Sequence, residues 1–125
     1  MQIQIKRVYE ERDKSDGFCV LVDRLWPRGI RKDAEKFDVW GKDLAPSREL
    51  REAFHGEDCD FDQFSTLYLK ELKRCSDAAD MIFKQADAEG SGVLTLMYAA
   101  KDEIHNHAAV LQSFLKKHYK KLHLP

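Results

Sequence analysis

Two short apolar runs of β-forming residues limit the folds that this chain of 125 residues can adopt. Residues 18–22 read FCVLV and residues 93–98 read VLTLMY. A strand with one solvated face alternates apolar and polar side chains, whereas a strand covered on both faces is apolar along most of its length. The two runs therefore predict strands in the interior of a parallel sheet.

Helical patterns occupy much of the chain between these two strands. Ser47 and Asp60 are expected N-caps of two helices, and a third helix is expected from Ser76 to the glycine at Gly90. Apolar residues recur in these segments at helical spacing, which is typical of helices with one buried face. This long helical connection predicts a crossover that makes the two strands parallel to each other.

The ends of the chain add one strand and one helix. Residues 2–9 alternate apolar and polar side chains, which predicts a half-covered strand. A last helix is expected from Asn106, and the basic segment at residues 117–125 is expected to fray. The chain is therefore predicted to form a single α/β domain over residues 1–125. We expect a small, mostly parallel sheet of three or four strands with helices packed on it.

The composition of the chain excludes several classes of function. It is 43% hydrophobic and 34% charged, with a net charge of −1. This balance argues against a general nucleic-acid partner, which would require a basic excess. No apolar run approaches the ~20 residues that cross a bilayer, so no membrane partner is expected. Cys19, Cys59 and Cys75 are odd in number and show no CxxC spacing, which favours free thiols in a reducing cytoplasm.

Charged residues follow both predicted interior strands. Asp23, Arg24 and Arg28 come after the first strand, and Lys101 and Asp102 come after the second. The carboxyl ends of parallel strands meet at one edge of a sheet, and ligands bind there in open α/β folds. The sequence therefore predicts a site for a small anion, such as phosphate, a nucleotide or a carboxylate, at this edge.

The expected site residues fall into two groups. The ligand-binding group offers positive charge or hydrogen-bond donors to an anion: Arg24, Arg28, Lys101, Asn106 and Arg51. The first turn of the last helix would add its free N–H groups. The catalytic group consists of side chains that can take up or release protons: Asp23, Asp102 and His107.

The sequence carries no motif for a metal or a cofactor. His105 and His107 straddle a predicted helix start, where alternate residues do not face each other, so no metal site is expected. His55 and Cys59 are close in sequence, but a nucleophilic pair requires spatial contact between the two side chains. No glycine loop of the P-loop or Rossmann type is present. The cofactor and the oligomeric state therefore stay open.

Two other interpretations are compatible with the same residues. In the first, the charges are structural, and Asp23 and Arg24 pair with each other or with Lys101 at the sheet edge. Arg28 would then stack on or cap a loop. In the second, the protein is a non-enzymatic interaction module. The loop region from Trp26 to Trp40, together with Arg51 and other basic residues, would then dock a protein or a nucleic acid.

These segments resemble a known family. The run DRLWPRG at residues 23–29 is similar to the signature of the YeaO-like proteins, small bacterial and archaeal proteins defined by a domain of unknown function. Residues 44–47 and 94–102 match as well, and the resemblance covers nearly the whole chain. It implies a cytosolic α/β protein. Wider relatives look as if they carry cysteines where this chain has Tyr98 and Asn106, so the resemblance does not imply cysteine chemistry here.

Overall fold

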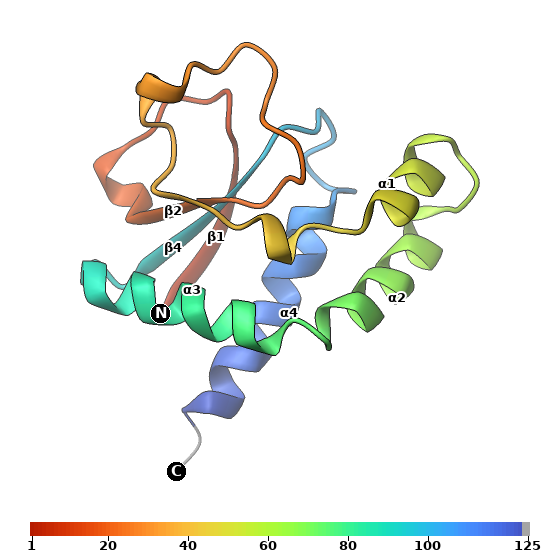
Figure 1. Ribbon diagram of the computed structural model, residues 1–125. Helices are drawn as coiled ribbons and strands as arrows, with labels where there is room; N and C mark the ends of the chain where they lie inside the picture. Colours follow the sequence, from red (N-terminus) through yellow and green to blue (C-terminus); the bar gives the residue numbers. More distant parts are fainter. Residues whose placement is uncertain (124–125) are drawn as a thin grey trace.

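Four parallel strands form the sheet of the computed structural model, which describes residues 1–123 (Figure 1). The strands are β1 (Gln2–Arg7), β2 (Phe18–Leu21), β3 (Val39–Trp40) and β4 (Val93–Tyr98). Their order across the sheet is β1-β4-β2-β3, so the last strand in sequence lies between the first two. The predicted α/β class and the single domain with a small parallel sheet are confirmed.

The register of β2 and β4 brings the ends of the two interior strands together. Leu21 pairs with Met97, and the N–H of Val22 donates to the carbonyl of Met97 at 2.9 Å. Because the strands are parallel, both chain segments leave the sheet at the same edge. The parallel pairing predicted from the helical crossover is therefore confirmed.

Strand β3 is the strand that the sequence did not predict. It pairs through Val39 and Trp40 with the end of β2. Two residues are too few to form a periodic pattern, so the segment resembles the loop around it. Its position depends on backbone hydrogen bonds from Asp38 to Cys19 and from Gly41 to Leu21, both 2.8 Å long.

Four α-helices follow the pattern expected from the sequence. They are α1 (Arg48–His55), α2 (Phe61–Leu72), α3 (Ser76–Glu89) and α4 (His107–Leu122). The side chains of Ser47, Asp60 and Asn106 accept backbone hydrogen bonds at the starts of α1, α2 and α4, as predicted. No helix in the described part of the chain is long and apolar enough to cross a membrane.

Helix α4 is longer than expected. It continues to Leu122, through residues 117–122 of the segment that was expected to fray. The helix persists because His118 stacks near Phe83 and lies 2.7 Å from the carboxylate of Asp80. Residues 124–125 of the expected tail lie outside the described residues.

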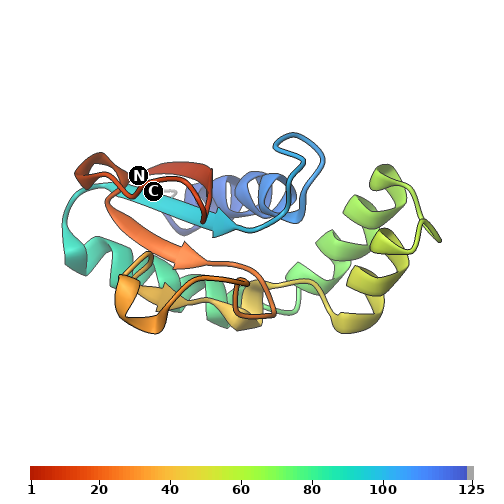
Figure 2. The ribbon, with the colours of Figure 1, turned by 90° about the horizontal axis from the view of Figure 1, so that it is seen from above.

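The two faces of the sheet are covered in different ways (Figure 2). Helices α3 and α4 lie on the same face, and their buried side chains join those of α2 in the main core. Loops cover the opposite face, where Phe37 and Trp40 pack on a smaller cluster. This cluster consists of Val8, Cys19, Leu21 and Met97.

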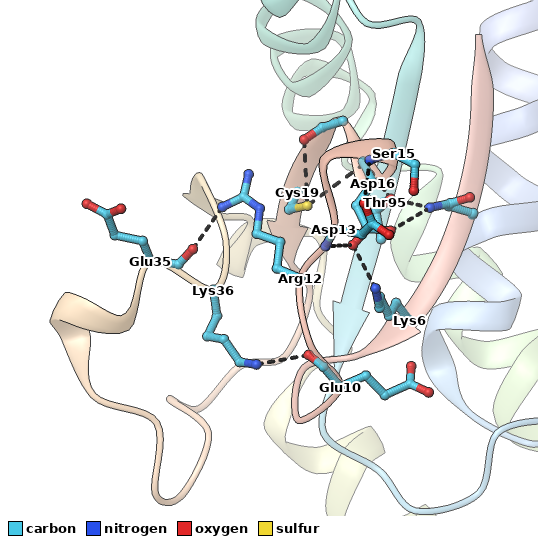
Figure 3. Close-up of polar contacts among 12 residues, drawn as sticks. Lys6, Glu10, Arg12, Asp13, Ser15, Asp16, Cys19, Glu35, Lys36 and Thr95 are labelled. Carbon is cyan, nitrogen blue, oxygen red and sulfur yellow. Dashed lines mark hydrogen bonds and ion pairs between the residues drawn. The ribbon is translucent and has the colours of Figure 1, made fainter.

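A buried polar cluster closes the loop-covered face beside β1 (Figure 3). The carboxylate of Asp16 accepts hydrogen bonds from the Asp13 N–H at 2.8 Å and from the Lys6 ammonium at 2.7 Å. The hydroxyl of Thr95 donates to the Asp16 carbonyl at 2.6 Å, and the amide of Gln4 donates to Thr95 at 2.8 Å. The cluster joins β1 and β4 to the turn that precedes β2.

Candidate functional site

A pocket of about 320 Å³ opens at the sheet edge where β2 and β4 end. Its walls come from the residues after β2, the residues after β4, helix α1 and the start of α4. Six of the side chains predicted from the sequence line it: Asp23, Arg24, Arg51, Lys101, Asn106 and His107. Leu25, Phe54 and Phe64 give the pocket an apolar wall.

Arg24 is held in the pocket wall by the backbone. Its Nε donates to the carbonyl of Pro46 at 2.9 Å. Among residues 1–123, no carboxylate lies within 4.0 Å of the Arg24 guanidinium. The pairing with Asp23 that a purely structural role would involve therefore does not occur in this part of the chain.

Arg51 comes from α1, a short helix that α2 holds in place. Glu71 on α2 accepts hydrogen bonds from the N–H of Ser47 at 2.8 Å and from its hydroxyl at 2.6 Å. The buried Tyr68 donates its hydroxyl to the carbonyl of Leu44 in the segment before α1. The Nε of Arg51 is buried and has no hydrogen-bond partner among the described residues.

Asp23 and His107 meet inside the pocket. Asp23 Oδ2 accepts the N–H of Ala99 at 3.0 Å, while Oδ1 lies 2.8 Å from His107 Nε2. The same nitrogen is 3.1 Å from the Val22 carbonyl and hydrogen-bonds there, so Asp23 Oδ1 lacks an aligned donor within the described structure. Both side chains are mostly buried, so the contact between them is largely shielded from solvent.

Lys101 directly follows Ala99 and Ala100, whose carbonyls are bound by Arg7. The Nε and Nη2 atoms of Arg7 donate to the carbonyls of Ala100 and Ala99 at 2.9 and 3.2 Å. The Lys101 side chain is exposed and has no carboxylate within 4.0 Å in the described part of the chain. The Lys101 side chain is therefore free to contact a ligand in the pocket.

Asn106 and Asp102 order the loop that leads into α4. Asn106 is 2% exposed, and its amide accepts the Ala109 N–H and donates to the Asp102 carbonyl, both at 2.9 Å. Asp102 is exposed and does not line the pocket. The N–H groups of His105 and Ile104 donate to its carboxylate and lower its pKa. Both side chains are thus engaged in positioning backbone.

Arg28 also lies outside the pocket, and its side chain is exposed. The ring of Trp26 packs against Trp40 on the loop-covered side of the sheet, with centroids 5.6 Å apart. Its indole N–H donates to the Ile30 carbonyl at 2.7 Å. The hydroxyl of Tyr9 holds the Arg28 carbonyl at 2.8 Å. These contacts turn residues 27–30 away from the pocket.

Two histidines in the pocket wall were not predicted from the sequence. His55 ends α1, four residues after Arg51, so the two lie on the same helix face. The four-residue spacing from Arg51 could therefore have indicated His55 as a pocket residue. His105 had no such signal, because the bonds to Asp102 decide its position. Within residues 1–123, no group of three or more His, Cys, Asp or Glu side chains is arranged to hold a metal ion.

Comparisons with known proteins identify a family and several relatives of this chain. A family model described as the inactive DUF488-N3 subclade matches residues 2–123. "Uncharacterized protein YeaO" of Escherichia coli K12 is 47% identical over 116 residues, which cover 93% of this chain and 98% of that protein. "Uncharacterized protein Rv3073c" of Mycobacterium tuberculosis H37Rv is 41% identical over 114 residues, or 91% and 93% of the two chains. No solved structure matches the chain.

Fold and pocket together define a small parallel α/β domain with a polar pocket at the carboxyl ends of its strands. Within that class, the chain belongs to the DUF488-N3 family, in the subclade described as inactive. The YeaO-like resemblance inferred from the sequence is confirmed.

Proposed function

We propose that this protein binds a small anionic molecule in the pocket at the sheet edge. One observation carries the proposal. Within the described residues, Arg51 Nε is buried without a hydrogen-bond partner, and the buried Asp23 Oδ1 has a 2.8 Å contact with His107 Nε2 but no aligned hydrogen bond. Both side chains line this pocket. Buried polar atoms in folded proteins are nearly always hydrogen-bonded. The two atoms therefore favour a ligand with oxygen acceptors for Arg51 Nε and with a hydrogen-bond donor, or a bridging water, for Asp23 Oδ1.

The charge of the pocket supports an anionic ligand. Arg24, Arg51 and Lys101 line it, and none of them has a carboxylate partner in the described structure. Asp23 is the one carboxylate among the described residues that line it. A guanidinium binds two oxygens of a phosphate or carboxylate at once, and the N-terminus of α4 adds a positive field. Phosphates, nucleotides and organic carboxylates share this chemistry.

The apolar wall restricts the ligand further. Phe54 and Phe64 stack on each other with centroids 4.5 Å apart, and Leu25 lies beside them in the lining. A volume of about 320 Å³ is at the lower end of the roughly 300–1,000 Å³ found for ligand pockets. The preferred ligand is therefore an organic anion with a compact apolar body, rather than a bare inorganic ion.

Binding without turnover is the favoured form of the proposal. The family description of an inactive subclade supports it. A second candidate is acid–base catalysis by His107, and the observation that favours it is the 2.8 Å contact with Asp23. A carboxylate beside an imidazole is a common way to orient a general base. Free thiols at all three cysteines agree with a cytoplasmic setting for either function.

The interaction module receives less support from the geometry. Both indole N–H groups already donate within the chain, Trp26 to Ile30 and Trp40 to Asp23, at 2.7 Å each. Arg51 lines the pocket. The tryptophans therefore have a role in holding the loop that covers the sheet, which accounts for them without a partner.

Thermal unfolding with added anions tests the proposal. The purified chain is melted with sulfate, phosphate, a nucleoside monophosphate and benzoate, and we expect at least one organic anion to raise Tm in a saturable manner. The variants Arg24→Ala and Arg51→Ala should each fold. Each should raise the Kd of that anion about tenfold or more, because it removes a charged hydrogen bond to the ligand. Arg28→Ala is the matched control, with the same charge change outside the pocket.

Two results would contradict anion binding: no anion shifts Tm, or Arg28→Ala weakens binding as much as Arg24→Ala does. The choice between binding and catalysis has its own measurement. The protein is incubated with phosphate monoesters and carboxylate esters, and the products are followed by mass spectrometry. Binding without turnover yields no product. Product formed by the wild type and lost in His107→Gln would instead establish the catalytic alternative.

A further inference from the structure

We propose that the groove between α2 and α4 is a docking surface for an acidic amphipathic helix of a partner protein. The groove has a volume of about 640 Å³ and shares no lining residue with the pocket at the sheet edge. The proposal is therefore independent of the anion site. It depends on the spacing, the exposure and the charge of the groove residues.

The lining of the groove forms two rows with four-residue spacing. The first row consists of Phe61, Ser65 and Leu69 on α2 and of Lys73, the residue that directly follows this helix. The row on α4 consists of Ala109, Ser113, Lys117 and Lys121. Both helices run in the same general direction (Figures 1 and 2). Rows of this spacing are the ridges that border a helix-packing groove, and a ridge of a third helix fits between them.

The groove offers an apolar floor with room for close approach. Leu69 is 37% exposed, and Phe61 and Phe114 are only partly buried. The side chains of Ser65 on one row and of Ala109 and Ser113 on the other are small. Small residues allow a partner helix to pack near the backbone, while the apolar side chains supply most of the binding free energy.

The charge of the groove selects an acidic partner. The two rows end in Lys73, Lys117 and Lys121, and no aspartate or glutamate among residues 1–123 lines the groove. Within residues 1–123, none of the three has a carboxylate within 4.0 Å. The whole chain has a net charge of −1, so this concentration of positive charge is local. A helix with a leucine stripe flanked by glutamates complements both the floor and the lysines.

Fluorescence anisotropy with a designed peptide tests the inference. The probe is a fluorescein-labelled helix of about 16 residues with leucines at four-residue spacing and glutamates beside them. We expect saturable binding that weakens as salt increases. The double variant Lys117→Glu/Lys121→Glu should raise Kd at least about tenfold, because it reverses two charges at the contact. The control is Lys116→Glu/Lys120→Glu, which makes the same charge change on exposed residues of α4 outside the groove.

Several results would overturn the inference. They are the absence of peptide binding, equal weakening by the two double variants, and equal binding of a peptide with lysines in place of its glutamates. Light scattering on the free protein tests whether a second copy of the chain occupies the groove instead. A dimer that Lys117→Glu/Lys121→Glu dissociates, with the control variant still dimeric, would assign the groove to a second copy of the chain. Leu69→Glu tests the apolar floor, because Leu69 is 37% exposed and can be changed without disturbing the core. This variant should also raise the Kd of the peptide, and an unchanged Kd would contradict the inference.

Discussion

Asp16 shows how this fold fixes the charge of one buried side chain. Burial alone would raise the pKa of Asp16, but the N–H of Asp13 and the ammonium of Lys6 outweigh that effect and lower it below its ordinary value of 3.8. The pKa of Lys6 is raised, mainly by its hydrogen bond to Asp16. The two charged forms therefore stabilise each other beside β1 (Figure 3).

The lowered pKa of Asp16 predicts a loss of stability in acid. As pH falls through 3.8, the unfolded chain binds a proton at this residue before the folded chain does. The stabilisation is thus complete above that pH and disappears as pH falls through the lower folded pKa. Asp16→Asn should reduce the free energy of unfolding at pH 7 by about 2 kcal/mol and flatten its acid dependence, measured by urea unfolding from pH 2 to 7. Asp33→Asn, in an exposed ion pair, is the control and should change little.

Cys19 is predicted to be unreactive in the folded protein. Burial raises the pKa of its thiol to about 11, so almost no thiolate forms near pH 8. Cys59 is only partly buried and should react first with iodoacetamide, as followed by mass spectrometry. Labelling of Cys19 at the same rate as Cys59 in the native protein would contradict this expectation.

Helix α1 is the element on which the pocket depends most. It has eight residues, too few for a stable isolated helix, so contacts with α2 must hold it. Ser47 and Glu71 supply two of these contacts, and Tyr68 supplies a third through Leu44. The sequence predicted the helix and its Ser47 cap. It could not predict the bond to Glu71, because 24 residues separate the partners.

Removing the Glu71 carboxylate should loosen α1. Glu71→Ala eliminates both hydrogen bonds to Ser47, and we expect faster hydrogen exchange in α1 together with a loss of about 1–3 kcal/mol in the free energy of unfolding. The control is Glu52→Ala, which removes an exposed i,i+4 pair with Arg48. Unchanged exchange in α1 of Glu71→Ala would show that other contacts are sufficient to hold the helix.

For the whole molecule, the strand order predicts where stability is concentrated. Strand β4 pairs with β1 on one side and with β2 on the other, whereas β3 contributes two residues at an edge. Amides of β4 should therefore exchange most slowly and those of β3 much faster. Leu96→Ala, at a fully buried position, should cost about 2–5 kcal/mol, measured by urea unfolding. Val39→Ala should cost clearly less, and equal losses would contradict the central role of β4.

Local sequence patterns determined most of the elements of this protein. Apolar runs and capping residues act within a few residues of the chain, so the interior strands and the starts of the helices could be predicted from the sequence. The charged residues that follow each interior strand could be predicted in the same way. Tertiary structure alone decided which charged residues of the chain share a pocket. Arg51 enters it because of contacts between α1 and α2, while packing around Trp26 turns Arg28 away. Such contacts join residues far apart in sequence, such as Asp23 and Ala99, and no local periodicity encodes them.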